Sequence, residues 1–178
     1  LYASILKPLS LIQGPPGTGK TTTACSILKA IHLLKENRLR EGGSAAQGQK
    51  LLKILACSHS NVAADNLLKG LADVGVKVIR LGRPTTVQSE LWPYTIDNIL
   101  QLDNEWLNAR ARLDRAIAYF GEMRKIGGPA FGSAQRFLES AQRNYEYIEK
   151  KCTYRIIDNA DVVVSTCIGA GGETLQAY

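Results

Sequence analysis

Short apolar runs alternate along the chain with longer segments in which apolar residues recur every three or four positions. This alternation is typical of a parallel sheet whose strands are joined by helices. It therefore predicts an α/β fold. Strands are expected at residues 9–13, 53–57, 76–81 and 161–166, and helices at residues 20–36 and 61–72.

The middle of the chain follows a different pattern. In residues 102–120 and 138–152, apolar positions are separated by steps of three and four, which is the spacing of helices that pack along a seam. Gly127-Gly128-Pro129 and Gly132 supply a break between them. We predict an antiparallel helical hairpin inserted into the core, and both a structural spacer and a surface for a partner or nucleic acid fit this pattern. The expected divisions are residues 1–94, 95–155 and 156–178.

Composition excludes several classes of protein. The 178 residues include 22 Lys or Arg and 16 Asp or Glu, a net charge of +6, which permits an anionic partner without requiring one. Collagen-like, disordered and disulfide-scaffold chains do not have this ordinary balance. No apolar run approaches the roughly 20 residues of a membrane span. The chain starts without Met, as expected of a fragment.

The four cysteines are scattered, and no C-x-x-C pair occurs, so a zinc site is not expected. Cys25, Cys57 and Cys167 stand among apolar or small residues. They predict buried, reduced thiols in an intracellular protein, cytoplasmic or nuclear.

Residues 14–21, Gly-Pro-Pro-Gly-Thr-Gly-Lys-Thr, fit the phosphate-loop (P-loop, or Walker A) pattern G-x-x-x-x-G-K-[ST]. Glycines let backbone N–H groups wrap a polyphosphate, and the following helix start favours an anion. Lys20 is expected to reach the β- and γ-phosphates of ATP, and the Thr21 hydroxyl to ligate Mg²⁺, which makes both candidate catalytic residues. The predicted ATP-binding residues are Gly14, Pro15, Pro16, Gly17, Thr18, Gly19, Lys20, Thr21 and Thr22.

Two further segments follow predicted strands. Residues 60–66 read Ser-Asn-Val-Ala-Ala-Asp-Asn, and residues 165–171 read Ser-Thr-Cys-Ile-Gly-Ala-Gly. With residues 8–21, they look like motifs Ia, Ic and I of superfamily-one helicases. The sequence closely resembles the up-frameshift group of these helicases, which includes relatives of senataxin and of the immunoglobulin mu-binding helicase. The similarity extends over the whole chain in the right order, and it is weakest across the hairpin.

This resemblance implies the first RecA-like motor domain of an ATP-driven translocase that moves 5′ to 3′ on single-stranded RNA or DNA. By match to the motifs, Ser60 and Asn61 would contact the strand backbone from a helix start, and Thr166 from a strand end. Capping of the helix by Ser60 or Asn61 fits the same residues. Arg80 and Arg83 flank a Gly-Pro turn, where a solvated loop and a phosphate contact both fit.

The resemblance also implies parts that the sequence lacks. The chain contains no Asp-Glu pair, and the family's acidic strand motif is expected beyond Tyr178. An adenine-reading glutamine is expected before Leu1, and a second motor domain elsewhere in the protein. We therefore expect an incomplete sheet and a fragment that is inactive alone. The alternatives are a non-catalytic nucleotide- or nucleic-acid-binding module and another P-loop ATPase.

Overall fold

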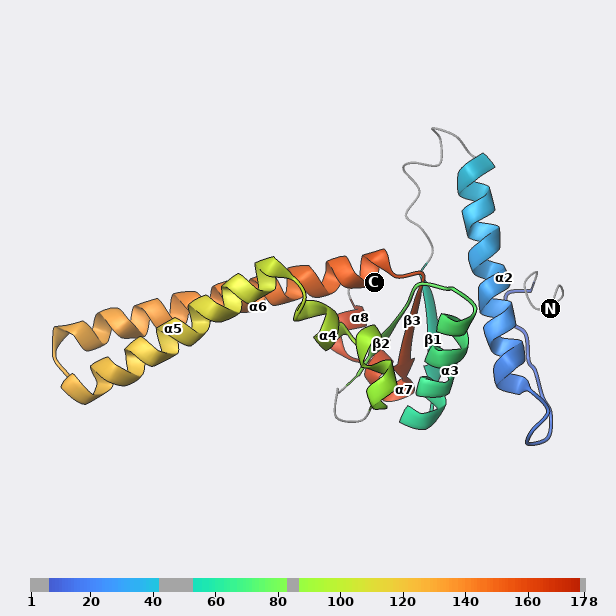
Figure 1. Cartoon of the computed structure of the whole chain (residues 1–178), viewed down its shortest axis with the longest axis horizontal. Coiled ribbons are helices and arrows are strands. Elements are labelled where there is room, and N and C mark those ends of the chain that lie inside the picture. The colour runs from blue at the N-terminus through green and yellow to red at the C-terminus, as the bar shows by residue number, and fades with distance from the viewer. Residues whose placement is uncertain (1–6, 42–52, 83–86, 177–178) are drawn as a thin grey trace. The chain divides into compact units, whose positions relative to one another are not determined.

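The computed structural model describes residues 7–41, 53–82 and 87–176. It divides the chain into two compact units (Figure 1). The α/β unit comprises residues 1–95 and 160–178, and the hairpin unit comprises residues 96–159. No helix among the described residues is both long and apolar enough to cross a membrane.

A parallel sheet forms the centre of the α/β unit. Its strands are β1 (Ile54–Ser58), β2 (Val78–Leu81) and β3 (Val162–Thr166), in the spatial order β1-β3-β2. In the two ladders Ser58 lies opposite Thr166, and Leu81 lies opposite Ser165. The carboxyl ends of all three strands therefore meet at one edge of the sheet (Figure 1). The architecture confirms the predicted α/β class and fits an incomplete RecA-like fold.

Helices cover this sheet. The helix α3 (Asn61–Asp73) buries Ala64, Leu68 and Leu71 in a core with Val162 and Val164 of β3. The remaining elements of this unit are α2 (Lys20–Glu41), the 3₁₀ helix η3 (Ser89–Tyr94), α7 (Cys167–Ala170) and α8 (Glu173–Gln176).

A glycine allows α2 to pack closely against α3. A Cβ atom at Gly70 of α3 would lie 2.8 Å from the sulfur of Cys25 on α2, so a side chain there would force the helices apart. Cys25 is buried in the core, as predicted.

The strand predicted at residues 9–13 is wrong. These residues form no ladder in the structure, and Leu9 and Leu11 are 84% and 92% exposed. An apolar run adopts a strand only where a neighbouring strand satisfies its backbone, and the run itself does not reveal whether that neighbour is present. The phosphate loop consequently follows a segment without regular secondary structure.

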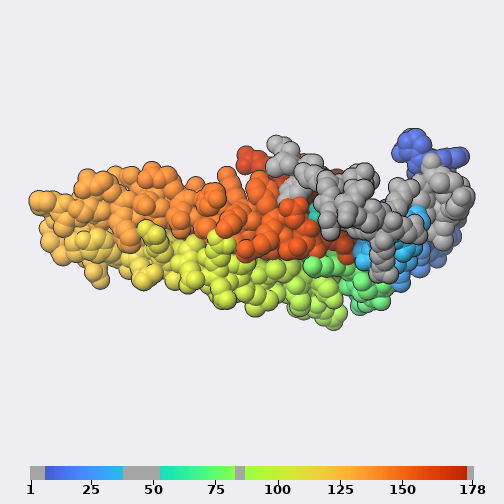
Figure 2. All heavy atoms as spheres, turned by 90° about the horizontal axis from the view of Figure 1, so that it is seen from above, coloured from blue at the N-terminus to red at the C-terminus, as the bar shows by residue number. Residues whose placement is uncertain are grey.

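The hairpin unit contains α4 (Ile96–Leu100), α5 (Asn104–Ile126) and α6 (Pro129–Asn159). Figure 2 shows α5 and α6 lying side by side along their length. The alternating steps of three and four place small and apolar residues on the seam, which allows the helices to approach closely. The buried residues of α5 and α6 are Ala109, Leu113, Ala116, Ala134, Ala141, Cys152, Ile156 and Ile157.

The turn between the long helices matches the predicted glycine break. Gly127 and Gly128 adopt φ values of 71° and 78°, which a residue with a Cβ atom rarely adopts. Gly132, which the sequence also assigned to the break, lies inside α6.

Asp103 fixes the start of α5. Its carboxylate accepts backbone N–H groups of Glu105 at 2.9 Å and Trp106 at 3.2 Å, and it also pairs with Arg155 of α6. Burial alone would raise the pKa of Asp103, but the N–H groups and the guanidinium outweigh it, so the net pKa is lowered. The ionised carboxylate is therefore the form that stabilises the hairpin.

Acidification should remove this contribution. Because the folded pKa is depressed, the stabilisation is complete above the ordinary aspartate pKa of about 3.9 and is lost as pH falls through the lower folded value. We expect Asp103→Asn, which keeps a capping oxygen but no charge, to lower the unfolding temperature at neutral pH. Thermal melts followed by circular dichroism should show this difference shrinking in acid, and a pH-independent difference would contradict it.

Candidate nucleotide and nucleic-acid sites

The phosphate loop stands directly before α2. Gly17 and Gly19 adopt φ values of 78° and 80°, and a Cβ atom at Gly14 would lie 2.7 Å from Thr18 Oγ1. The loop therefore curls more tightly than side chains at these positions would permit. Thr18 Oγ1 also donates to Pro15 O at 2.8 Å, which bridges the turn from inside.

Lys20 reaches back across this loop. Its ammonium group donates to Gly14 O at 2.7 Å and to Pro15 O at 2.6 Å. The positive charge is thus held over the turn at the first residue of α2. The first turn of α2 contains no acidic residue, so nothing there offsets the attraction of the helix start for an anion.

These groups fit a nucleoside triphosphate with Mg²⁺. Backbone N–H groups of a tight glycine loop, an ammonium group and an uncompensated helix start are donors suited to phosphate oxygens. Thr21 and Thr22 are exposed in the first turn of α2. The Thr21 hydroxyl is the type of ligand that Mg²⁺ accepts beside phosphate oxygens, because this ion keeps most of its other ligands as water.

Two helix-capping hydroxyls lie at the carboxyl edge of neighbouring strands. Ser60 Oγ accepts the N–H of Ala63 at 3.2 Å and caps α3, and Thr166 Oγ1 accepts the N–H of Gly169 at 3.1 Å and caps α7. The capping role considered for Ser60 is therefore present in the structure. A hydroxyl that accepts one hydrogen bond can still donate its own proton, so capping leaves both residues able to bind a phosphate oxygen.

Gly169 permits the second of these caps. A Cβ atom at this position would lie 2.6 Å from Ser165 Oγ and 3.2 Å from Thr166 Oγ1. Any side chain at this position would disturb both hydroxyls. The Thr-x-x-Gly spacing in residues 166–169 therefore shapes this end of β3.

Asn61 is held by a buried ion pair. Its Oδ1 accepts Arg80 Nη2 at 3.0 Å, while Arg80 Nε donates to Asp65 Oδ1 at 3.2 Å. The side chains of Arg80 and Asp65 are 0% and 2% exposed. Because the oxygen of the Asn61 amide faces the guanidinium, its NH₂ group is directed elsewhere and can act as a donor.

The position of Arg80 differs from the one expected. The sequence expected Arg80, beside a turn at the end of the strand 76–81, to be solvated or to touch phosphate. Arg80 does belong to the strand, β2, but its guanidinium is buried. It also donates through Nη1 to Leu81 O, and a Cβ atom at Gly82 would lie 2.9 Å from this nitrogen. The turn glycine thus leaves room for the side chain to fold back. Arg83 lies outside the described residues.

Asp65 is the residue that sequence reasoning missed. Besides Arg80, it accepts the backbone N–H of Gln88 through Oδ2 at 3.3 Å. Its spacing in the sequence could have identified it. Asp65 precedes Leu68 by three positions, which places the carboxylate on the same apolar face of α3. A carboxylate on a buried helix face requires a cation or several donors as partners.

The cysteine predictions are partly wrong. Cys25 is buried, whereas Cys57 on β1 and Cys167 at the start of α7 are exposed free thiols. Small or apolar sequence neighbours do not determine which face of the sheet is covered. Cys152 of the hairpin is buried.

One group of metal-ligand types occurs among the described residues, in the hairpin unit. It consists of Asp103, Glu105 and Cys152. Its carboxylates already pair with Lys151 and Arg155, and the Lys151 Nζ to Glu105 Oε1 distance is 2.7 Å. Since two cations neutralise this cluster, we interpret it as an ion-pair network that joins α5 to α6.

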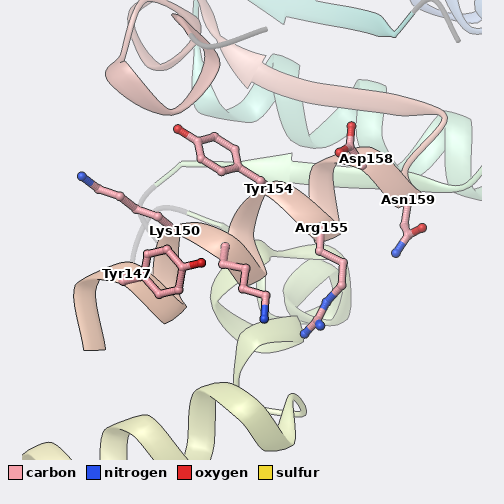
Figure 3. Close-up of a pocket in the computed structure, with 7 residues that line it drawn as sticks. Tyr147, Lys150, Tyr154, Arg155, Asp158 and Asn159 are labelled. Carbon is pink, nitrogen blue, oxygen red and sulfur yellow. The ribbon is translucent and has the colours of Figure 1, made fainter. Parts of the chain in front are cut away.

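A surface groove of about 570 Å³ follows α6 in the hairpin unit (Figure 3). Its lining residues are Tyr147, Lys150, Lys151, Tyr154, Arg155, Asp158 and Asn159. Tyr154 and Asp158 extend to one side of the helix and Arg155 to the other (Figure 3). None of the residues predicted to bind nucleotide or nucleic acid lines this groove.

Comparison with known proteins supports the resemblance inferred from the motifs. Residues 2–178 match a family described as AAA domain. The chain is 34% identical over 170 residues to ATP-dependent helicase NAM7 of Saccharomyces cerevisiae, covering 96% of this chain and 14% of that protein. It is 33% identical over 174 residues to regulator of nonsense transcripts 1 of Dictyostelium discoideum, covering 96% and 11%.

A third relative is DNA-binding protein SMUBP-2 of Mus musculus, which is 29% identical over 174 residues that cover 97% of this chain and 16% of that protein. The chain therefore spans less than a fifth of the length of these relatives. The similarity to superfamily-one helicases of the up-frameshift group is confirmed.

Proposed function

The chain belongs to the AAA domain family, and from this premise we propose that it is part of an ATP-dependent nucleic-acid helicase. It binds ATP with Mg²⁺ through the phosphate loop and the backbone of a single strand through the carboxyl edge of the sheet. Such a motor acts on nucleic acid inside the cell, in the cytoplasm or the nucleus. The remaining domains of the same protein complete the machine.

The observation that carries this proposal is the geometry of residues 14–20. Left-handed glycines curl the loop before a long helix, and the Lys20 ammonium lies over the turn within 2.7 Å of two carbonyl oxygens. Binding of a triphosphate replaces those carbonyls with phosphate oxygens as the partners of Lys20. Charge-assisted bonds of this kind are roughly twice as strong as neutral ones, so the exchange is favourable.

Mg²⁺ would be held by the Thr21 hydroxyl together with phosphate oxygens and water. When bound, the ion neutralises charge on the phosphates and polarises them. The loop and Lys20 hold the triphosphate in one orientation, which is the contribution that a phosphoryl-transfer site requires from the protein.

Ser60, Asn61 and Thr166 would contact the backbone of the bound nucleic-acid strand. Each offers a hydroxyl or amide donor at the same edge of the sheet, because the β1–β3 ladder places Ser58 opposite Thr166. Such donors bind phosphate oxygens without reading sequence, as a translocating motor requires. Arg80 acts through Asn61, which it holds by the 3.0 Å hydrogen bond, rather than by touching the strand.

Binding to single-stranded nucleic acid should weaken steeply as the salt concentration rises. We expect the full-length protein to bind single-stranded oligonucleotides with a log–log salt slope of about −0.7 per phosphate neutralised. Thr166→Val and Ser60→Ala should each weaken binding several-fold on RNA and DNA alike, because their contacts are to the backbone. Fluorescence anisotropy across a salt series measures both the affinity and the slope.

Ser26→Ala is the matched control. Ser26 is an exposed hydroxyl on α2 that donates to Thr22 O at 2.9 Å, and it is not among the residues expected to contact the nucleic-acid strand. The Ser26→Ala substitution should leave binding to the nucleic-acid strand unchanged. Salt-insensitive binding, or equal losses in all three variants, would refute the strand contacts. Strand binding without strand-stimulated ATP hydrolysis would instead identify a non-catalytic binding module.

A further inference from the structure

The 3₁₀ helix η3 presents one large aromatic ring to solvent. Trp92 is 36% exposed, whereas Leu91 before it is buried and Tyr94 after it packs against the core of the α/β unit. Single exposed apolar residues are common on protein surfaces, so exposure alone assigns no role to this ring. Its support and its neighbours are the features that suggest one.

The backbone of Trp92 is held in place from the C-terminal side. Its carbonyl oxygen accepts the backbone N–H of Thr95 at 3.0 Å and the Thr95 hydroxyl at 2.8 Å. Thr95 is fully buried, and it forms a parallel bridge with Arg80 of β2. The next residue, Pro93, has its φ angle fixed by its own ring. The indole therefore stands on a fixed support, so a partner that stacks on it pays little to order the backbone.

Hydrogen bonds link the start of η3 to Asn61. The backbone N–H of Gln88, the residue before η3, donates to Asp65 at 3.3 Å. Asp65 also accepts Arg80, which in turn donates to Asn61 at 3.0 Å. Trp92 follows Gln88 by four residues, about 8 Å at the rise of a 3₁₀ helix. The exposed ring and the Asn61 amide, a proposed contact of the nucleic-acid backbone, therefore belong to neighbouring parts of one unit.

We propose that Trp92 is a stacking platform for a base of the bound single strand. The proposal rests on the proposed function, in which Ser60, Asn61 and Thr166 hold the phosphates. Every base has a π-face, so an aromatic side chain can stack on it without reading sequence, as a translocating motor requires. Contacts to the backbone and to one base would together fix the position of the strand on this domain.

Oligonucleotides with and without bases test the proposal in the full-length protein. Trp92→Ala should weaken binding to ordinary single-stranded DNA by about 5- to 100-fold, the effect of losing one stacked base. Binding to an abasic oligonucleotide of the same length should not change, because this ligand has no base to stack. The salt slope should also stay the same, since Trp92 neutralises no phosphate. Fluorescence anisotropy measures the affinities, and circular dichroism checks the fold of each variant.

Conservative variants separate stacking from packing. Trp92→Phe keeps an aromatic ring and should retain most of the affinity, whereas Trp92→Leu keeps apolar bulk without a π-face and should bind as weakly as Trp92→Ala. The matched control is Tyr119→Ala, because Tyr119 of α5 is a similarly exposed ring, at 39%, and its removal should leave binding unchanged. Equal losses on ordinary and abasic oligonucleotides, full affinity in Trp92→Leu, or an equal loss in the control would overturn the proposal.

The same measurements distinguish this proposal from the proposed function. If the native protein bound neither oligonucleotide in a salt-dependent way, the strand-binding function itself would be wrong. If Thr166→Val weakened binding to both oligonucleotides while Trp92→Ala weakened neither, the backbone contacts would remain and the stacking would be wrong. The exposed ring would then serve a partner other than nucleic acid.

Discussion

Replacing Lys20 with alanine is expected to weaken ATP binding by about 10- to 100-fold while the fold remains intact. The change removes charge-assisted hydrogen bonds to phosphate, which are worth about 1.5–3 kcal/mol. In the structure the Lys20 ammonium contacts only two exposed loop carbonyls among the described residues, so little of the packing depends on it. Calorimetric titration with ATP and Mg²⁺ measures the affinity, and circular dichroism checks the fold.

Lys69→Ala is the control for this variant. Lys69 is an exposed lysine of α3, so its removal changes the net charge equally without touching the loop. ATP affinity should stay unchanged in this control. Equal effects of the two substitutions would mean that overall charge, rather than the loop, attracts the nucleotide. An unchanged affinity in Lys20→Ala would contradict the nucleotide site itself.

Asp65→Ala should be the most destabilising single change in the α/β unit. It leaves the Arg80 guanidinium, whose side chain is 0% exposed, without its carboxylate partner. Breaking a buried pair in this way costs about 3–5 kcal/mol of unfolding free energy. It also removes the acceptor of the Gln88 N–H. Urea unfolding of the variant and the native protein measures the difference.

An exposed pair provides the comparison. Arg110 and Asp114 of α5 approach to 3.2 Å, but their side chains are 50% and 55% exposed. Asp114→Ala should therefore change stability only slightly. Replacing Asp65 and Arg80 together with apolar residues should recover part of the loss, because no unpaired charge is then buried. If Asp65→Ala cost no more than Asp114→Ala, the buried pair would not have the role described here.

The elements that sequence predicted well are those whose signal is local. The seam of the hairpin follows from the steps of three and four, and Ala109, Leu113 and Ala116 are buried as this spacing requires. The phosphate loop follows from its glycines, because the need for positive φ at Gly17 and Gly19 is a property of the loop itself.

The features that sequence missed depend on distant partners. Residues 9–13 have the composition of a strand but no ladder, since pairing is decided by other strands. Arg80 stands beside a turn in sequence, yet its partner Asp65 lies fifteen residues earlier on α3. The exposure of Cys57 likewise depends on which face of β1 is covered. None of these can be read from neighbouring residues alone.

The pairing of β1 with β3 sets how much length variation this protein tolerates. One residue inserted within β3 would advance Thr166 by about 3.3 Å and turn the following side chains to the opposite face, while Ser60, which follows β1, would stay in place. The two phosphate donors would then no longer lie at the same level along the edge of the sheet. Insertions at the hairpin turn near Gly127 have no such effect, so changes in chain length are harmless there and damaging within the strand.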